Sequence, residues 1–258
     1  MARVTVITGG ASGIGLATAR RVRQSGGRVA LLDIDLDRCR RAAEELGEGV
    51  AALHGDVVDE ASLSAAADRV ERELGDIGAL VCAAGAPQVP GRMDDMTVAE
   101  WEAVTASHLK GTFLTCRIFG RRMVDGGRGG AIVNIASVTG FRPGPTYAYA
   151  PAKAAVINLT MILAVDWARA GVRVNAVAPG WTDTAFLTRK SDPAKPRDMS
   201  ALAKASPLGR LLTADEIAEV IVFLLSPQSS AILGCTVPCD GGFQASLGWA
   251  PYGGAPQP

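Results

Sequence analysis

The sequence predicts an α/β fold: one domain built on a doubly wound, seven-stranded parallel sheet that is flanked by helices. Two observations support this prediction. Short apolar runs rich in β-branched residues alternate with longer stretches of helical periodicity along the 258 residues of the chain. The short runs are continuously apolar, which is typical of parallel strands buried on both faces.

Six apolar runs, and a seventh near the end of the chain, are the predicted strands: Val4–Thr8, Arg28–Asp33, Val50–Gly55, Ala79–Cys82, Ala131–Ala136, Val172–Val177 and Cys235–Cys239. The stretches between them are the predicted helices: Ile14–Gln24, Leu36–Leu46, Glu60–Leu74, Val98–Met123, Ala152–Arg169 and Ala214–Leu225. Alternation at this spacing implies right-handed βαβ units, with helices on both faces of the sheet. Ligands of such sheets bind at the carboxyl ends of the strands.

Two segments fall outside this pattern. Residues Lys190–Asp198, KSDPAKPRD, are polar and contain proline, so they predict a mobile loop. Residues 1–243 are expected to form the domain, substrate site included, and residues 244–258 a C-terminal tail. The last residues of that tail, GWAPYGGAPQP, predict irregular structure.

Composition argues against several kinds of partner. The 26 Lys and Arg balance the 26 Asp and Glu, so we expect neither nucleic acid nor an anionic membrane as a partner. No apolar run is expected to reach the length of a membrane span, and the N-terminal MARVTVITGG does not read as a secretory signal. Five scattered cysteines without a CxxC pair, and two distant histidines, argue against a metal site and predict free thiols in a reducing cytoplasm.

A glycine-rich turn, TGGASGIG, follows the first predicted strand and precedes the first helix. Gly9, Gly13 and Gly15 supply flexible backbone where the strand becomes a helix, whose N-terminal N–H groups can hold a phosphate. The spacing differs from the usual G-x-G-x-x-G, and a purely structural turn also needs glycines. Its place between a strand and a helix favours a nucleotide site.

Two aspartates lie at the ends of the next two strands. Asp33 can accept hydrogen bonds from both adenosine ribose hydroxyls and would repel a 2′-phosphate, which predicts NAD in preference to NADP. Asp33 can instead simply cap the next helix. Asp56, in HGDV, can accept a hydrogen bond from the adenine amino group, or be an ordinary aspartate at a strand end.

Six segments, in order, resemble the short-chain dehydrogenase/reductase family over nearly the whole chain, about Arg3–Gly242. They are the turn TGGASGIG, the adenine-edge segment HGDV, the catalytic-serine segment NIASVTG, the Y-x-x-x-K motif in YAPAK, the nicotinamide segment NAVAPGWTDT, and VPCDGG. The resemblance implies a single-domain Rossmann-like fold of the short type. It also implies a homotetramer, in which the long helices pair across a two-fold axis.

The resemblance further implies which residues contact the cofactor. They are Gly9, Ser12, Gly13, Ile14, Gly15, Asp33, Asp56, Val57, Ala83, Ala84, Gly85, Tyr149, Lys153, Pro179, Gly180, Thr182 and Thr184.

The chain departs from the family pattern at two places. The family's N-N-A-G is CAAG here, so two asparagine side chains are lost and Gly85 is kept. His108 stands where the family has a catalytic asparagine, which helps hold a water that links the lysine to solvent. His108 can donate and accept hydrogen bonds, so it can form a modified relay. It can equally well only pack within its helix.

The spacing selects Tyr149 over Tyr147 as the catalytic tyrosine. Tyr149 and Lys153 are four residues apart, so one helical turn places them on the same face. Tyr147 has Pro151 at that spacing instead, and predicts a packing or pocket-wall residue. A proline fits only in a first helical turn, so Pro151 indicates that the helix begins close to Tyr149.

The chemistry expected of this set is hydride transfer between nicotinamide and a secondary alcohol or ketone. Tyr149 would be the general acid/base, with its pKa lowered by Lys153 and the nicotinamide charge. Ser137 would hydrogen-bond the reacting oxygen, and Lys153 would also hold the nicotinamide ribose. Lys153 should also push the pKa of His108 down.

The substrate is less clear from the sequence. Pocket walls are expected from Gln88–Met93, Val138–Tyr147 and Trp181–Ser191, whose aromatic residues suggest an apolar pocket. Two alternatives stay open: a catalytically silent nucleotide-binding scaffold or sensor on the same fold, and a dehydratase or epimerase.

Overall fold

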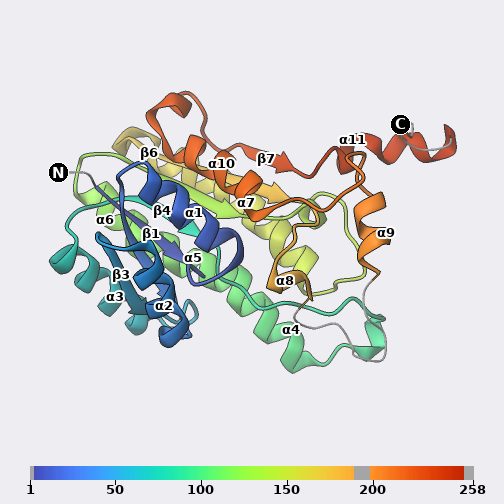
Figure 1. Ribbon diagram of the computed structural model, residues 1–258, viewed down its shortest axis with the longest axis horizontal. Helices are drawn as coiled ribbons and strands as arrows, with labels where there is room; N and C mark the ends of the chain where they lie inside the picture. The colour runs from blue at the N-terminus through green and yellow to red at the C-terminus, as the bar shows by residue number, and fades with distance from the viewer. Residues whose placement is uncertain (1–2, 189–197, 253–258) are drawn as a thin grey trace.

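The computed structural model describes residues 3–188 and 198–252. Its centre is a fully parallel, seven-stranded sheet in the order β3-β2-β1-β4-β5-β6-β7 (Figure 1). The strands are β1 (Val4–Thr8), β2 (Arg28–Asp33), β3 (Val50–His54), β4 (Ile77–Cys82), β5 (Gly130–Ile135), β6 (Val172–Pro179) and β7 (Thr236–Cys239). The predicted fold class and all seven strands are confirmed, with small differences at some strand ends.

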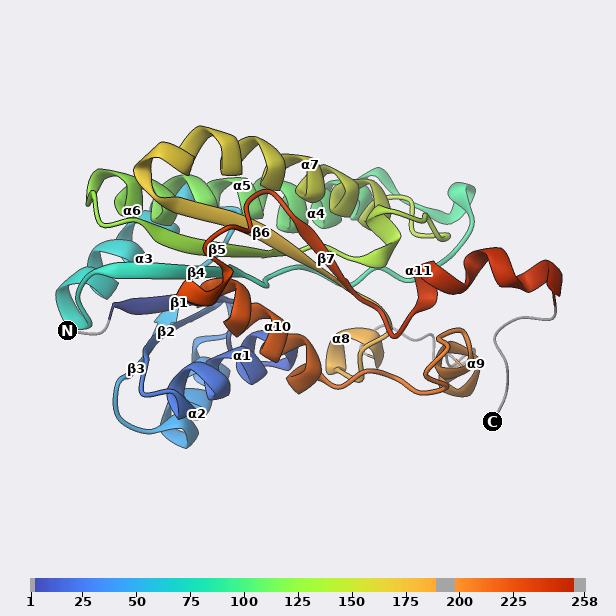
Figure 2. The ribbon, with the colours of Figure 1, turned by 90° about the horizontal axis from the view of Figure 1, so that it is seen from above.

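Helices cover both faces of the sheet (Figure 2). One face carries α1 (Gly13–Gln24), α2 (Leu36–Leu46) and α10 (Ala214–Leu225). The other carries α3 (Glu60–Glu73), the helical segments between Val98 and Asp125, and α7 (Tyr149–Trp167). The two largest clusters of buried apolar side chains lie in these two layers. Both faces of the strands are therefore buried, as their continuous apolar runs predicted.

The strand order places a switch point between β1 and β4. The chain winds from β1 outwards to β3, and then returns to pair β4 with the other side of β1. The loops that follow β1 and β4 therefore separate at the carboxyl edge, which is where open α/β sheets bind their ligands.

The predicted single α-helix Val98–Met123 is wrong in detail. The helical path is continuous, but two π-helical turns, Ala106–Lys110 and Cys116–Gly120, separate α4 (Val98–Thr105), α5 (Gly111–Thr115) and α6 (Arg121–Asp125). A π turn inserts one extra residue and re-aims the side chains around it, and such turns are frequent at functional sites. The first of them carries His108.

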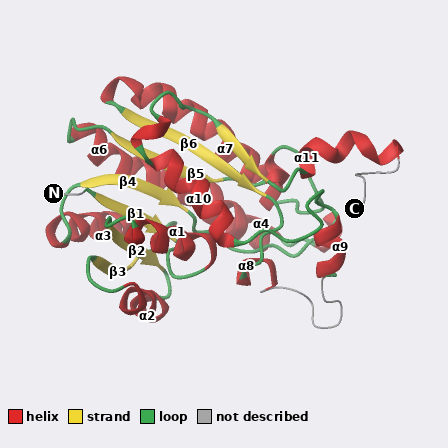
Figure 3. Cartoon of the chain, turned by 45° about the horizontal axis from the view of Figure 1, so that its top comes forward, coloured by secondary structure: helices red, strands yellow, loops and turns green. Residues whose placement is uncertain are grey.

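Three short helices that the sequence did not predict lie beyond the carboxyl edge of the sheet (Figure 3). They are α8 (Ala185–Thr188), α9 (Met199–Lys204) and α11 (Phe243–Ser246). The expectation of an irregular tail is wrong up to Tyr252, because a 3₁₀ run, Leu247–Tyr252, follows α11. Of the predicted loop Lys190–Asp198, only Asp198 lies within the described residues, where its carboxylate caps α9.

One helical segment, Tyr149–Ala170, is long and apolar enough by composition to cross a membrane, with a mean hydropathy of 1.2. The expectation that no such run exists is therefore wrong. The segment packs on β6, and Ala152, Val156 and Ala164 are buried there. A core helix meets the same length and composition test.

Candidate active site

A pocket of about 730 Å³ opens at the carboxyl edge of the sheet, beside the switch point. This volume lies in the range of roughly 300–1,000 Å³ that is usual for small-molecule and cofactor sites. All the residues that the sequence predicted for catalysis or cofactor contact line this one pocket. They come from segments between Gly9 and Thr184, so the fold brings together side chains that are far apart in the sequence.

The glycine turn forms one wall. Gly9 and Gly13 have φ angles of +65° and +53°, which residues that carry a Cβ rarely adopt. A Cβ on Gly15 would lie 2.4 Å from the carbonyl oxygen of Gly9, and one on Gly9 would lie 2.9 Å from the backbone of Ala83. The side chain of Ser12, the residue before α1, makes no capping hydrogen bond. The helix N-terminus, with glycine backbone that can approach closely, fits the phosphates of a dinucleotide.

Asp33 and Asp56 line the pocket where β2 and β3 end, on the other side of the switch point from β5. Asp33 is buried, and its Oδ1 accepts a hydrogen bond from the backbone N–H of Asp35 at 3.1 Å. Asp33 does not cap α2. The cap is Asp35, whose side chain accepts a hydrogen bond from Arg38 N. Asp56 Oδ1 accepts from Val58 N at 3.0 Å. Each carboxylate still has one oxygen that could meet an adenosine.

Arg38 is a pocket residue that the sequence analysis missed. Its Nη2 lies 3.6 Å from Asp33 Oδ1 and 3.4 Å from Asp35 Oδ2. The guanidinium is thus paired with the carboxylate that was assigned to the adenosine ribose. The only signal in the sequence is an arginine one helical turn past the Asp35 cap, which is common on solvated helix faces.

The segment CAAG, at the end of β4, faces the glycine turn. Its backbone is held by Thr8: Ala83 N donates to Thr8 O at 3.2 Å, and Ala84 N donates to Thr8 Oγ1 at 3.4 Å. Two hydrogen bonds to Thr8, one to its carbonyl oxygen and one to its hydroxyl, thus fix this wall without the family's asparagine side chains. Gly85 is required for a different reason, because a Cβ there would lie 2.0 Å from His108 Cε1.

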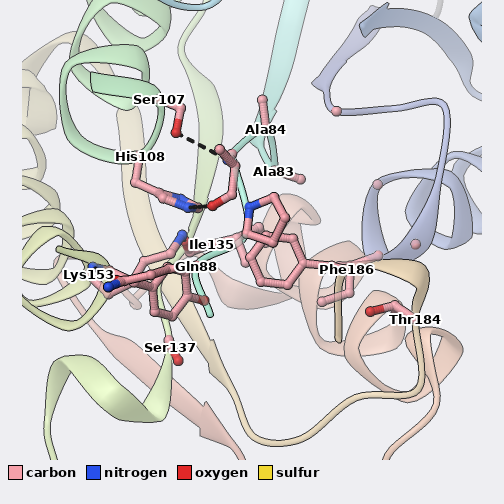
Figure 4. A pocket seen from close by; sticks show the side chains of 18 of the residues that line it. Ala83, Ala84, Gln88, Ser107, His108, Ile135, Ser137, Lys153, Thr184 and Phe186 are labelled. Carbon is pink, nitrogen blue, oxygen red and sulfur yellow. Dashed lines mark hydrogen bonds between the residues drawn. The ribbon is translucent and has the colours of Figure 1, made fainter. Parts of the chain in front are cut away.

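Tyr149 and Lys153 lie one turn apart at the start of α7, as predicted. Lys153 is buried, and its Nζ donates to the carbonyl oxygen of Ile135 and lies 5.5 Å from the centre of the Tyr149 ring. Figure 4 shows Lys153, Ser137 and His108 reaching the same region from three different elements. Tyr147 lies outside this pocket, in a smaller hollow that it shares with Trp101.

Ser137 is oriented by Thr139, two residues later. The Ser137 Oγ accepts from Thr139 N at 3.2 Å and from Thr139 Oγ1 at 3.0 Å. A hydroxyl has two lone pairs and one proton, so these bonds use both lone pairs. The proton that remains can be donated to the Tyr149 oxygen, with which Ser137 is hydrogen-bonded, or to a substrate oxygen.

The pKa values differ from the expectation that Lys153 activates Tyr149. Loss of hydration raises the pKa of Tyr149 to about 12, and the hydrogen bond from Ser137 offsets this only in part. Burial lowers the pKa of Lys153 to about 7, so this amine is largely uncharged when the phenol would ionise. The protein by itself thus keeps Tyr149 protonated, and Lys153 alone does not lower its pKa.

His108 is buried against the loop that follows β4. Its Nε2 lies 2.8 Å from the carbonyl oxygen of Ala86, which can only accept, so Nε2 carries the proton. Its Nδ1 is buried and finds no hydrogen-bond partner among the described residues. Burial, aided by the Lys153 charge, lowers the pKa of His108 well below its usual value. His108 is therefore a neutral imidazole, and its ring packs edge-on against Tyr149 at 4.8 Å between ring centres.

The segment after β6 closes the pocket on the remaining side. Pro179, Gly180, Thr182 and Thr184 all line it, and a Cβ on Gly13 would lie 3.5 Å from Thr184 Cγ2. This segment is held from behind, because Asp183 N donates to Leu212 O and Leu212 N to Trp181 O. Phe186 follows and lies 5.9 Å from the Tyr149 ring centre, which makes this end of the pocket apolar.

The chain is similar to known proteins over nearly its whole length. A family model described as enoyl-(acyl carrier protein) reductase matches residues 9–244. Cis-4-hydroxycyclohexanecarboxylate dehydrogenase of Sinomonas cyclohexanicum is 38% identical over 247 residues, which cover 94% of this chain and 97% of the relative.

Two solved structures from Brucella melitensis have the same fold. One, described as ribose-5-phosphate isomerase from strain 16M, is 42% identical with a TM-score of 0.93, covering 99% of this chain and 97% of its own. The other is 3-ketoacyl-(acyl-carrier-protein) reductase in complex with NADH. It is 30% identical with a TM-score of 0.87, and the match covers 93% of this chain and 98% of the reductase chain.

Proposed function

This chain belongs to the short-chain dehydrogenase/reductase family, and from this premise we propose that it interconverts a secondary alcohol and a ketone with NAD(H), using Tyr149 as the general acid/base. Its relatives act on CH–OH groups, and the chain is an oxidoreductase of that class. The observation that supports the proposal best is one pocket that is lined both by Tyr149, Ser137 and Lys153 and by Asp33, which ends β2 on the other side of the switch point from β5.

The residues fit a dinucleotide. The backbone of Gly9 and Gly15 leaves no room for a Cβ, the N-terminus of α1 faces the pocket, and Asp33 lies beyond it. Lys153 is close enough to the catalytic end to hold a ribose hydroxyl. A bound nicotinamide would supply the hydride carrier and, when oxidised, a positive charge.

The chain's own residues carry the proton. In ketone reduction, Tyr149 is protonated and donates its proton to the developing alkoxide. Ser137, whose lone pairs are occupied by Thr139, donates a hydrogen bond to the same oxygen. In alcohol oxidation Tyr149 must ionise, which its pKa of about 12 disfavours until positive charge is bound nearby.

We propose NAD(H) as the preferred cofactor because of the Asp33 carboxylate. A 2′-phosphate would meet this charge in a buried position. Arg38 does not reverse the preference, since its guanidinium is paired with Asp33 and Asp35. Steady-state kinetics with both cofactors test this, and equal or better efficiency with NADP(H) would contradict it.

The substrate class follows from the walls around Tyr149. Phe186, Val138 and Trp181 line this end of the pocket with apolar surface, while Ser137 and Tyr149 meet the reacting oxygen. A ketone or secondary alcohol with apolar substituents fits these walls. A screen of cyclic and open-chain ketones, followed by the absorbance of reduced cofactor, identifies the substrate type. Absence of turnover on every ketone and alcohol would favour the silent nucleotide-binding alternative.

One neighbour suggests a second candidate, because the structure that is 42% identical is described as a ribose-5-phosphate isomerase. Aldose–ketose isomerisation needs no nicotinamide, so Asp33 and the rest of the adenosine end of the pocket would have no use in it. Incubation with ribose 5-phosphate in the absence of any nicotinamide separates the two candidates.

We also propose a homotetramer in the cytoplasm. Val98 and Trp101 on α4, and Met161, Ile162 and Val165 on α7, are exposed apolar side chains on the layer that the family uses for pairing. The five cysteines are free, which suits a reducing compartment. Light scattering tests the first proposal, because a mass near the 26.7 kDa of a single chain would contradict it. Cell fractionation tests the second.

A further inference from the structure

The start of α7 has an unusual problem with its backbone hydrogen bonds. The first N–H groups of any helix have no partner within the helix, and a polar N-cap side chain normally accepts from them. The N-cap residue here is Ala148, whose methyl group cannot accept a hydrogen bond. Ala148 and Ala150 are both buried, so water is not a ready substitute. Another acceptor must therefore serve the N–H groups around Tyr149.

That acceptor is the side chain of Gln88, from the loop after β4. Its Oε1 accepts from Tyr149 N at 2.8 Å and from Ala148 N at 3.2 Å. Two donors point at this atom, which identifies it as the amide oxygen. Gln88 is itself buried, and its Nε2 lies 3.7 Å from Met96 Sδ. A glutamine 61 residues earlier in the chain thus caps the catalytic helix.

The rest of the first turn is satisfied locally. Ala150 N donates to Thr146 O at 3.0 Å, and Ala152 N donates to Ala148 O at 3.1 Å. Pro151 lies between them and has no N–H to satisfy. Among contacts between described residues, only the N–H groups of Ala148 and Tyr149 reach outside the segment, and both donate to Gln88.

The loop that carries Gln88 is held firmly on its other side. Both peptide groups of Ala86 are bound by the first π turn: Ala86 N donates to Ser107 Oγ at 3.1 Å, and His108 Nε2 donates to Ala86 O at 2.8 Å (Figure 4). Gln88 follows two residues later. A chain of hydrogen bonds therefore runs from the π turn, through this loop, to the backbone of Tyr149.

We propose that Gln88 is a positioning residue for Tyr149: its amide oxygen fixes the first turn of α7, and thereby the place of the phenol in the pocket. This inference rests on the proposed role of Tyr149 as the general acid/base. Gln88 acts through the backbone of Tyr149 and takes no part in proton transfer.

The test compares Gln88→Met, which removes the acceptor at similar size, with Gln88→Glu, which keeps it. We expect Gln88→Met to lower kcat about 10- to 100-fold, because small displacements of a reacting group cost that much. The Kd for NADH, measured by fluorescence, should change little, and KM should change less than kcat. Gln88→Glu should restore most of kcat. Its carboxylate should also shift the Tyr149 limb of the pH profile to higher pH, since it disfavours the phenolate.

Two controls isolate the capping role. Gln228→Met makes the same change at an exposed turn and should behave as the wild type. Met96→Leu removes the sulfur beside the Gln88 Nε2 and should leave turnover unchanged. Near-normal kcat in Gln88→Met, a change in KM alone, or a Gln88→Glu enzyme as impaired as Gln88→Met would each overturn the inference.

The remaining outcomes are also decisive. If Gln88→Met does not fold, Gln88→Glu decides: retained turnover with a shifted limb supports the inference, and an unshifted profile overturns it. Tyr149→Phe is measured alongside. Normal turnover in Tyr149→Phe would mean that the proposed function fails. If Tyr149→Phe is inactive and Gln88→Met is normal, only the inference about Gln88 fails.

Discussion

Mild acid should destabilise this protein through His108, and His108→Asn should remove that part of the sensitivity. The folded protein keeps His108 neutral, because burial and the Lys153 charge lower its pKa well below the usual value. The unfolded chain protonates the same imidazole below a pKa of about 6.5. Below that pH the unfolded state binds more protons, so the free energy of unfolding falls as the pH falls towards the folded pKa.

The size of the effect follows from the protonation of the unfolded imidazole. At pH 5.0 an imidazole with a pKa of about 6.5 gains about 2 kcal/mol from protonation, and this gain stabilises only the unfolded chain. A chain of this length has an unfolding entropy of about 0.5 kcal/mol/K, so the loss corresponds to about 4 °C in Tm.

The assay is thermal unfolding of wild type and His108→Asn, without ligand, near pH 7.5 and pH 5.0. His54, Lys153 and the carboxylates are present in both proteins, so they largely cancel in the difference. The Tm of the wild type should fall by about 4 °C more than that of His108→Asn. An equal fall in the two proteins would refute the claim that His108 is held neutral in the fold.

The same variants test whether His108 takes part in proton relay. If its free Nδ1 serves a water near Lys153, turnover should show a weak acid-side limb that His108→Asn removes, with activity kept or raised. His108→Ala would leave the Ala86 carbonyl without its donor and should be less active. An unchanged pH profile in both variants would rule out the relay role, and His108 would then act only through its contacts with Ala86 and Tyr149.

Three further predictions concern the pocket. Tyr149→Phe should lower kcat by about 10²- to 10⁴-fold, which is the usual contribution of a general acid/base, and NADH binding should be retained. Tyr147→Phe should change kcat little. Comparable losses of kcat in the two variants, measured by stopped-flow, would refute the assignment. Thr139→Val should lower kcat about 3- to 10-fold, because it removes the hydrogen bond from the Thr139 hydroxyl to Ser137 Oγ, and one neutral hydrogen bond has an effect of this size. Thr139→Ser keeps the hydroxyl and should stay near wild type. Identical kinetics for both variants would show that this hydrogen bond is unimportant. Asp33→Asn should raise kcat/KM for NADP(H), because it removes the repulsion and releases Arg38 from one of its two partners. The gain should be smaller in the Asp33→Asn, Arg38→Ala double variant, and an equal gain in steady-state kinetics would show that Arg38 plays no part.

Local signals made much of the fold predictable. Both ends of α2 and α10 agree with the prediction to the residue, and in the structure Asp35 and Thr213 cap their N-termini. The π turns were not predictable, since an inserted residue leaves helical periodicity and propensity almost unchanged. The short helix α11 was not predicted either, and its Phe243 packs edge-on against Trp181, a contact that the sequence does not show.

The sequence predicted which residues line the candidate site better than it predicted their pKa values. The strand order brings every predicted residue to one pocket, because motifs that end strands meet at the carboxyl edge. The raised pKa of Tyr149 was not foreseen, since it depends on burial that no motif reports. Gln88 was missed as a contributor because its partners, Ala148 and Tyr149, are 60 and 61 residues away in the sequence. Arg38 was missed because an arginine one turn past a helix cap is common on solvated helix faces.

The Asp33–Arg38 ion pair has a consequence for how this enzyme's lineage can change. The charge that would attract a 2′-phosphate already lies 3.6 Å from the charge that repels it. Aspartate codons are one nucleotide from codons for asparagine, glycine and alanine, so one point mutation removes the repulsion and leaves Arg38 paired with Asp35 alone. Under the NAD(H) preference proposed above, a single point mutation at Asp33 would therefore shift a descendant towards NADP(H).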